Sequence, residues 1–150
     1  MTCLFRYRKM PGVTPPSAAN SLDAGADALI MDLMKIVSLD KVPSSVPHMD
    51  GVQGLRKQVP VGVEDGTPTM SLRVFTVEPG GYTPYHSHPW EHINYILAGE
   101  GVMVDEAGTG HPIKAGDYAL VLPDEKHQFR NTEDATEDLQ FICLVPRERE

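Results

Sequence analysis

The most informative run in the sequence is Tyr85-His86-Ser87-His88-Pro89-Trp90-Glu91-His92, which holds three histidines within seven residues. In an extended strand, residues i and i+2 lie on one face. We therefore expect His86 and His88 to be strand neighbours that point the same way, about 6–7 Å apart. Pro89 cannot donate a hydrogen bond to a strand ladder, so the strand should end there and the chain should turn around Trp90. His92 is then expected to return towards the first two imidazoles from the start of the next strand.

A fourth histidine, His127, stands apart in the sequence and is the natural partner of these three. It follows the turn-like Pro123-Asp124-Glu125-Lys126 and precedes the strand-like Gln128-Phe129-Arg130. A single histidine is usually a surface residue or a hydrogen-bonded core group. This clustering instead favours a metal site, since neutral imidazole binds Mn, Fe, Co, Ni, Cu and Zn. His48 and His111 have no such neighbours, and we assign them to the surface or to structure. We predict one divalent transition metal per chain, held by His86, His88, His92 and His127.

The chain around this run consists of short segments rich in β-branched and aromatic residues, separated by glycine-containing turns. We predict strands over residues 36–39, 54–61, 69–77, 93–97, 101–104, 118–122 and 139–145. Glycine supplies the positive φ angles that tight corners need, and the predicted turns are Gly62, Asp65-Gly66, Pro79-Gly80-Gly81, 98–101, 108–110 and 115–117. Short strands at this spacing, without helices between them, indicate an all-β antiparallel sandwich or closed barrel.

Residues 1–34 differ in composition and are predicted to form an N-terminal extension, with the barrel domain over residues 35–150. Residues 10–20 are rich in Pro, Gly and Ser and cannot bury enough apolar surface to order themselves. From Leu22 to Val37, apolar residues recur at helical spacing, so the extension is expected to be flexible or partly helical. The sequence leaves open whether the native chain starts at Met1, Met31 or Met34.

Composition narrows the class of protein. With 150 residues, of which 41% are apolar and 23% charged, the chain is the size of one globular domain. Its net charge of −8 argues against a nucleic-acid partner, because phosphate binding depends on clustered Lys and Arg. No run approaches the ~20 apolar residues of a membrane span, and the two cysteines, Cys3 and Cys143, form no disulfide framework. We expect a cytoplasmic protein that binds neither nucleic acid nor membrane.

These residues resemble the cupin superfamily over roughly residues 35–146. The first cupin motif begins with a glycine, continues through His-x-His and closes with a second glycine, here at Gly80, His86, His88 and Gly99. The second motif is matched, with small spacing differences, by Gly116, Pro123, His127 and Asn131. The resemblance implies a double-stranded β-helix, or jelly-roll, barrel. It also implies a homodimer, because most members of the family are dimeric.

One departure from the family pattern concerns the fourth ligand. The glutamate that often fills this role is absent, since its alternative positions carry His92 and Ile93, so the run resembles the small tetra-histidine cupins. Glu91 should face away from the ion, because neighbouring strand residues lie on opposite faces. We expect it to be a hydrogen-bond partner that orients one of the imidazoles. Four neutral ligands leave the full +2 charge on the ion, which strengthens it as a Lewis acid for anionic or enolate-like ligands. In octahedral coordination two cis positions stay open for water, substrate or O₂.

Four further residues are predicted to line a substrate pocket: Arg73, Phe129, Phe141 and Cys143. Arg73 either clamps a substrate carboxylate or lies on the outer face of its strand. Phe129 shares strand parity with His127, and Phe141 and Cys143 share one face of the last strand. We interpret Cys143 as a small buried apolar residue rather than a nucleophile, since no basic or thiolate-stabilising neighbour is evident.

The resemblance implies a mononuclear metal-dependent enzyme of dioxygenase type that acts on a small oxygenated organic molecule, with Mn or Fe favoured over Ni, Cu and Zn. Two alternatives stay open. One is an isomerase or lyase that uses the metal as a Lewis acid, for which the sequence names no general base. The other is a non-catalytic module that binds a metal or a small molecule, because a fold does not fix a function. No catalytic residue is assigned.

Overall fold

The computed structural model describes residues 34–150, so the predictions for residues 1–33, including the helix from Leu22, lie outside the described residues. The division into an extension and a domain therefore stays a prediction. Met34–Ser38 has no regular secondary structure, and Leu39–Lys41 forms a single 3-10 turn, η1. The strand predicted over residues 36–39 is wrong. β-branched residues form a strand only beside a partner on which they can pack, and Ile36 is 89% exposed.

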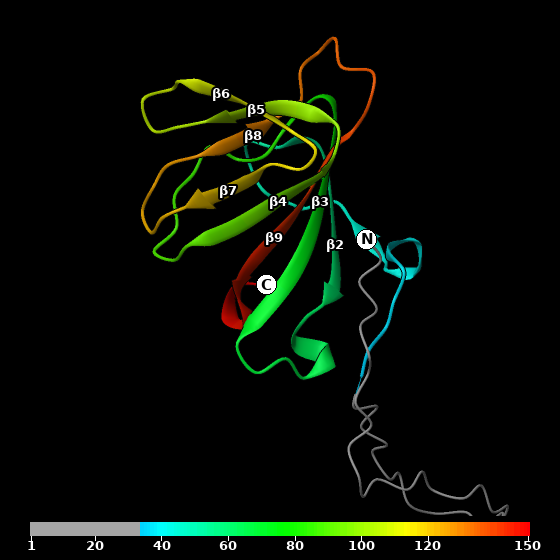
Figure 1. The fold of residues 1–150 in the computed structure, drawn as a ribbon. Coiled ribbons are helices and arrows are strands. Elements are labelled where there is room, and N and C mark those ends of the chain that lie inside the picture. The colour runs from blue at the N-terminus through cyan, green and yellow to red at the C-terminus, as the bar shows by residue number, and fades with distance from the viewer. Residues whose placement is uncertain (1–33) are drawn as a thin grey trace, which may run out of the picture. The chain divides into compact units, whose positions relative to one another are not determined.

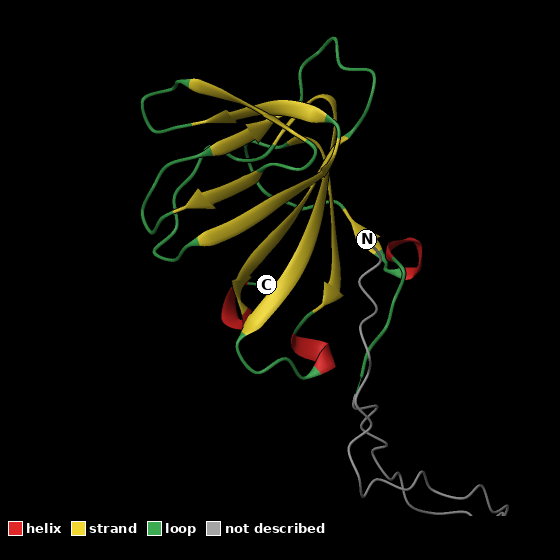
Figure 2. Cartoon of the chain, viewed as in Figure 1, coloured by secondary structure: helices red, strands yellow, loops and turns green. Residues whose placement is uncertain are grey.

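The described chain is all-β, and its strands form one curled antiparallel sheet (Figures 1 and 2). Hydrogen-bonded neighbours follow the order β6-β5-β8-β3-β9-β4-β7, while β2 also pairs with β3, and β1 with β2. Two further 3-10 turns are η2 (Val63–Asp65), after β2, and η3 (Arg147–Arg149), after β9. The predicted all-β jelly roll is confirmed. The strands are β1 (Ser44–Ser45), β2 (Gln53–Val61), β3 (Met70–Tyr82), β4 (His92–Ala98), β5 (Glu100–Val104), β6 (Gly110–Lys114), β7 (Tyr118–Val121), β8 (Gln128–Arg130) and β9 (Leu139–Pro146).

β3 is longer than predicted, because the predicted turn Pro79-Gly80-Gly81 lies inside the strand. The first part of β3 pairs with β9, from Met70↔Pro146 to Val77↔Leu139, and its end pairs with β8 through Tyr82↔Arg130. Gly80 has a φ of 73°, and the register between β2 and β3 shifts at the same level of the sheet. A bulge with a left-handed glycine bends a strand, so this bend allows β3 to leave β9 and join β8.

The core forms from the inward-facing residues of the sheet. Buried and partly exposed residues alternate along β9, so Phe141 and Cys143 share the inner face, as predicted. Phe141 stacks on Phe129 with ring centroids 4.3 Å apart, and Phe129 in turn lies 6.4 Å from the ring of His127. The core therefore borders the histidines. Its buried members are Leu55, Val77, Ile96, Phe129, Leu139, Phe141, Cys143 and Val145.

Two strands were not predicted. β6 contains Gly110 and Pro112, which are poor strand residues, and it forms because it pairs with β5 in a hairpin. β1 has only two residues, too few to show a period. The other predicted strands are present with shifted ends. Among the residues that the structure describes, no helix has the length and apolar character needed to cross a membrane.

Candidate metal centre

His86 and His88 lie in the connection between β3 and β4. β3 ends at Tyr82, and His86 takes part only in an isolated bridge with His127. The prediction that His86 and His88 are neighbours in one strand is therefore wrong. Pro84 removes a backbone donor just after β3, so regular pairing ends before the histidines. The bridge itself is reciprocal: the His86 N–H donates to the His127 carbonyl at 3.2 Å, and the His127 N–H donates to the His86 carbonyl at 2.9 Å.

The four imidazole rings nevertheless converge. His92 is the first residue of β4 and is buried, whereas Glu91 is exposed, so the two face opposite ways as strand alternation predicts. The ring centroid of His88 lies 4.2 Å from that of His86 and 5.0 Å from that of His92. The ring centroid of His127 lies 5.2 Å from that of His86, 5.1 Å from that of His92 and 6.2 Å from that of His88. The structure thus brings together the four histidines that the sequence pattern selected.

Burial keeps these imidazoles neutral near pH 7. Burial, together with the nearby charges of His88, His127 and Arg73, lowers the pKa of His86 from 6.5 to about 4. Burial and the nearby charges of the other three histidines and Arg73 lower the pKa of His92 to about 3. Burial also lowers the pKa values of His88 and His127. Each ring then has one unprotonated nitrogen. In His127 this is Nε2, because Nδ1 donates its hydrogen to the Glu125 carbonyl at 3.0 Å.

His92 Nε2 is the polar atom of this cluster that most needs a partner. It is buried, and among the described residues it has no hydrogen-bond partner, which costs free energy unless something else binds it. In the same part of the chain, no group of three or more His, Cys, Asp or Glu side chains is arranged to hold a metal ion. Among the described residues, the four rings converge without forming a complete ligand set.

The histidines line a cavity of about 280 Å³. Aromatic walls come from Phe75 and Trp90, and the Trp90 ring stacks on His88 with centroids 4.5 Å apart. One cavity therefore combines four imidazoles, apolar walls and a guanidinium group. The predicted pocket residues all line it: Arg73, Phe129, Phe141 and Cys143.

Arg73 points into this cavity, which decides between the two orientations that the sequence left open. Its register partner on β9 is Cys143, and its Nη2 donates to Cys143 Sγ at 3.1 Å. The expectation that Cys143 has no basic neighbour is wrong, because this contact depends on a cross-strand register that the sequence does not show. Burial raises the pKa of the Cys143 thiol more than Arg73 lowers it. Cys143 is therefore a small buried group rather than a thiolate nucleophile.

Comparison with known proteins identifies the family. The Cupin domain family matches residues 73–145. Protein SchB of Streptomyces halstedii is 33% identical over 116 residues, which are 75% of this chain and 80% of that protein. The chain belongs to the cupin superfamily.

The solved structures that are similar to this cupin include two that are named for a reaction. The polyketide cyclase RemF from Streptomyces resistomycificus shares 26% sequence identity with a TM-score of 0.71, over 75% of this chain and 79% of RemF. A predicted oxalate decarboxylase from Thermotoga maritima shares 28% identity with a TM-score of 0.65, over 75% of this chain and 99% of that protein. These two proteins are named for different reactions.

The cupin cavity also contains residues that the sequence analysis did not select for the pocket. Lys57 lies two residues after the inward-facing Leu55, and Asn94 lies two residues after His92. The sequence could have indicated both residues, because side chains two positions apart in a strand lie on the same face. Arg149 lies in η3, and no sequence pattern places this C-terminal turn beside the cavity.

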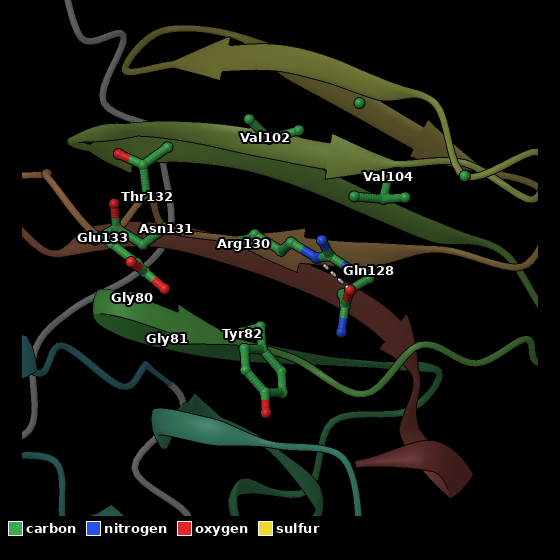
Figure 3. Close-up of a pocket in the computed structure, with 12 residues that line it drawn as sticks. Gly80, Gly81, Tyr82, Val102, Val104, Gln128, Arg130, Asn131, Thr132 and Glu133 are labelled. Atoms are coloured by element: carbon green, nitrogen blue, oxygen red, sulfur yellow. Dashed lines mark hydrogen bonds between the residues drawn. The ribbon is translucent and has the colours of Figure 1, made fainter.

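A second hollow, of about 540 Å³, lies against β3, β5 and β8 (Figure 3). Figure 3 shows Arg130 directed along β8 towards Gln128, whose Oε1 accepts a hydrogen bond from Arg130 Nε. None of the four clustered histidines lines this hollow, so the smaller cavity is the candidate site of the cupin. The other two described histidines agree with their assignment, since His48 is exposed and His111 contacts Asp105 at the surface.

Proposed function

We propose that this cupin is a metal-dependent enzyme of the tetra-histidine type. One divalent transition metal is held by His86, His88, His92 and His127, and a small carbonyl compound is transformed in the same cavity. The observation that carries the proposal is the convergence of four neutral imidazoles on one cavity, with His92 Nε2 buried and without a partner among the described residues.

The donor set fits a transition metal. At metal–nitrogen distances of about 2.1 Å, imidazole centroids lie about 4.5–5.2 Å apart for neighbouring ligands and about 6.4 Å apart for opposite ones. Ring separations of 5.0 to 5.2 Å lie within the first range, and the 6.2 Å between His88 and His127 is close to the second. The 4.2 Å between His86 and His88 is shorter than either, which agrees with the absence of a complete ligand set among the described residues. Neutral nitrogen donors suit transition metals better than Ca²⁺ or Mg²⁺, which prefer oxygen. The choice among Mn, Fe, Ni, Cu and Zn stays a prediction, with Mn or Fe favoured.

Bound there, a divalent ion would act as a Lewis acid with its full +2 charge, because none of its protein ligands is anionic. The residues of the chain supply the rest of the site. Asn94 lines the cavity, and its buried Oδ1 has no hydrogen-bond partner in the described part of the chain. It can therefore accept a hydrogen bond from an enol or hydroxyl of the substrate. The rings of Phe75, Trp90 and Phe129 give the cavity apolar walls, and polar interactions are stronger where such walls keep water out.

The reaction that fits best is ring closure of a polycarbonyl compound, in which an enolic carbon adds to a carbonyl. Support comes from the likeness to a polyketide cyclase, at 26% identity and a TM-score of 0.71, and from a ligand set that favours enolate-like groups. A cavity of about 280 Å³ lies near the lower end of small-molecule sites. It accommodates a small substrate or one end of a longer one. The dioxygenase reaction stays a prediction. A measurement of O₂ consumption distinguishes it from cyclisation, which consumes no O₂.

Metal binding is tested by calorimetric titration of the EDTA-treated protein with Mn²⁺ and with Zn²⁺, and by elemental analysis of the protein as purified. We expect one ion per chain for the wild type and at least a hundredfold weaker binding for His92→Gln. His111→Gln is the matched control and should bind as the wild type does. Absence of stoichiometric binding, or equal affinities of the two variants, would overturn the metal site.

Turnover is tested on the metal-loaded protein with heptane-2,4,6-trione, whose ring closure with loss of water gives a methylresorcinol. We expect this product to form equally under argon and in air. Oxygen uptake with acetylacetone as substrate, without cyclisation of the trione, would replace the proposal with a dioxygenase. Absence of any turnover by a protein that binds its metal would favour a non-catalytic binding module.

The predictions of a homodimer, of a cytoplasmic location and of no nucleic-acid partner remain proposals. Size-exclusion chromatography with light scattering measures the mass of the particle and so tests the first of them. A mass of one chain over the micromolar range would exclude a stable dimer.

A further inference from the structure

Three cationic side chains line the cavity that contains the histidines: Lys57 on β2, Arg73 on β3 and Arg149 in η3. Lys57 pairs in register with Phe75, so it shares the inner face with Arg73, which lies two residues before Phe75. The C-terminal turn lies beside the start of β3 (Figure 1), where the Arg147 N–H donates to the Thr69 carbonyl at 2.9 Å. Three separate elements thus bring positive charge to one space.

Arg73 is held in place without an acidic partner. Its Nη1 donates to the Arg149 carbonyl at 3.2 Å and its Nη2 to Cys143 Sγ at 3.1 Å. Its guanidinium carbon lies 5.1 Å from the centroid of the Phe75 ring. Its Nε is buried and has no hydrogen-bond partner among the described residues. A buried guanidinium nitrogen without a hydrogen-bond partner costs free energy, and a carboxylate is a group whose geometry the guanidinium matches.

The acidic side chain that lines the described cavity, that of Glu150, is already engaged. Its Oε2 accepts hydrogen bonds from the Val63 N–H at 2.7 Å and from Ser71 Oγ at 2.8 Å. Within residues 34–150, none of the three cations forms an ion pair. Burial and the charge of Arg73 lower the pKa of Lys57, with Glu150 opposing the effect. The cavity therefore has an excess of positive charge in a chain whose net charge is −8.

We propose that Lys57, Arg73 and Arg149 form a binding site for a carboxylate, and that the substrates of this protein are oxo acids. The carboxylate contacts the three cations while the carbonyl faces the histidines. The second part rests on the proposed function, whereas the carboxylate site itself does not. A carboxylate is favoured over a phosphate because no glycine lines the described cavity, so the backbone N–H cradle typical of phosphate sites is missing.

The test uses the full-length chain without metal, titrated calorimetrically with acetoacetate and with methyl acetoacetate, its uncharged ester. We expect acetoacetate to bind at least tenfold more tightly than the ester. Lys57→Gln and Arg149→Gln should each remove most of this preference. Lys114→Gln makes the same change of charge at an exposed position on β6, outside the cavity, and should leave the preference intact. Arg73→Gln is less informative, because Arg73 also contacts Cys143 and can affect folding.

Equal binding of acetoacetate and its ester would overturn the carboxylate site, and so would an undiminished preference in both Lys57→Gln and Arg149→Gln. Inorganic phosphate that binds as tightly as acetoacetate, with the same sensitivity to the variants, would overturn the choice of carboxylate. Metal titration of Lys57→Gln and Arg149→Gln separates the two proposals, since both should bind Mn²⁺ or Zn²⁺ as the wild type does. A protein that binds acetoacetate but no metal would refute the proposed function and leave the carboxylate site standing.

Discussion

Lowering the pH from 7.5 to 5 should destabilise the metal-free protein, and His92 should account for a defined part of the loss. His92 is buried, and its pKa in the folded protein is about 3, against about 6.5 in an unfolded chain. As the pH falls through 6.5, the unfolded chain takes up a proton on this residue and the folded protein does not. The free energy of unfolding therefore falls with falling pH. The loss due to His92 reaches about 2 kcal/mol at pH 5 and continues to grow until about pH 3.

Urea denaturation of the EDTA-treated protein at several pH values measures this loss. His92→Gln retains a polar side chain that cannot take up a proton, so its stability should fall by about 2 kcal/mol less over the same interval. His48→Gln alters an exposed histidine and should follow the wild type. Equal losses in the wild type and in His92→Gln would refute the reasoning. An NMR titration that placed the pKa of folded His92 near 6.5 would refute it independently.

Three further predictions concern stability and reactivity. Gly99→Ala should lower the free energy of unfolding by more than ~2 kcal/mol, since Gly99 has a φ of 72° and a Cβ there would clash with the Asp138 carbonyl oxygen. Gly108→Ala, at a φ of 80° with no atom within 4 Å, should lower the free energy of unfolding by only about 1–2 kcal/mol in the same urea assay. Equal losses in the two variants would argue against a clash at Gly99. Phe141→Ala should cost about 3–5 kcal/mol because this side chain is buried and stacked on Phe129. Leu120→Ala, at an exposed position, should cost less than about 1 kcal/mol, and a comparable loss there would contradict the assignment of the core. In a Cys3→Ser background, Cys143 should react with a disulfide reagent at pH 7.5 at least tenfold more slowly than free cysteine, because burial raises the pKa of its thiol; reaction at the rate of free cysteine would show that the thiol is accessible and ionised.

Features with a short sequence period could be predicted. Along β9 the alternation that places Phe141 and Cys143 on one face is a local pattern, and the structure reproduces it. The four histidines were selected by their spacing and by the resemblance to a family, and the structure places them around one cavity. In the first case the signal lies within a few residues, and in the second it lies in two known motifs of one family.

Features that depend on pairing between distant segments could not be predicted. Gly80 looked like part of a turn, yet it bends a continuous strand, because β2, β8 and β9 supply partners on both sides of the bend. The contact of Arg73 with Cys143 needs the register of β3 on β9, across 70 residues. At Ile36 the error was the reverse, because a strand was predicted and none is present. Its β-branched side chain favours a strand, but no partner strand lies beside it in the described chain.

The way the two cupin motifs meet explains why the histidines converge. The backbones of His86 and His127 bond to each other in both directions, at 3.2 and 2.9 Å. Next to this bridge, Thr83 Oγ1 accepts a hydrogen bond from the Phe129 N–H at 2.9 Å, and the Thr83 carbonyl accepts one from Gln128 Nε2 at 2.6 Å. These bonds join the connection after β3 to β8 through main-chain and buried polar groups, so the fold itself brings the imidazoles together. A metal ion then needs only to reorient rings that already share a cavity. Its binding energy should therefore appear as affinity and as added stability, while the metal-free protein keeps its fold.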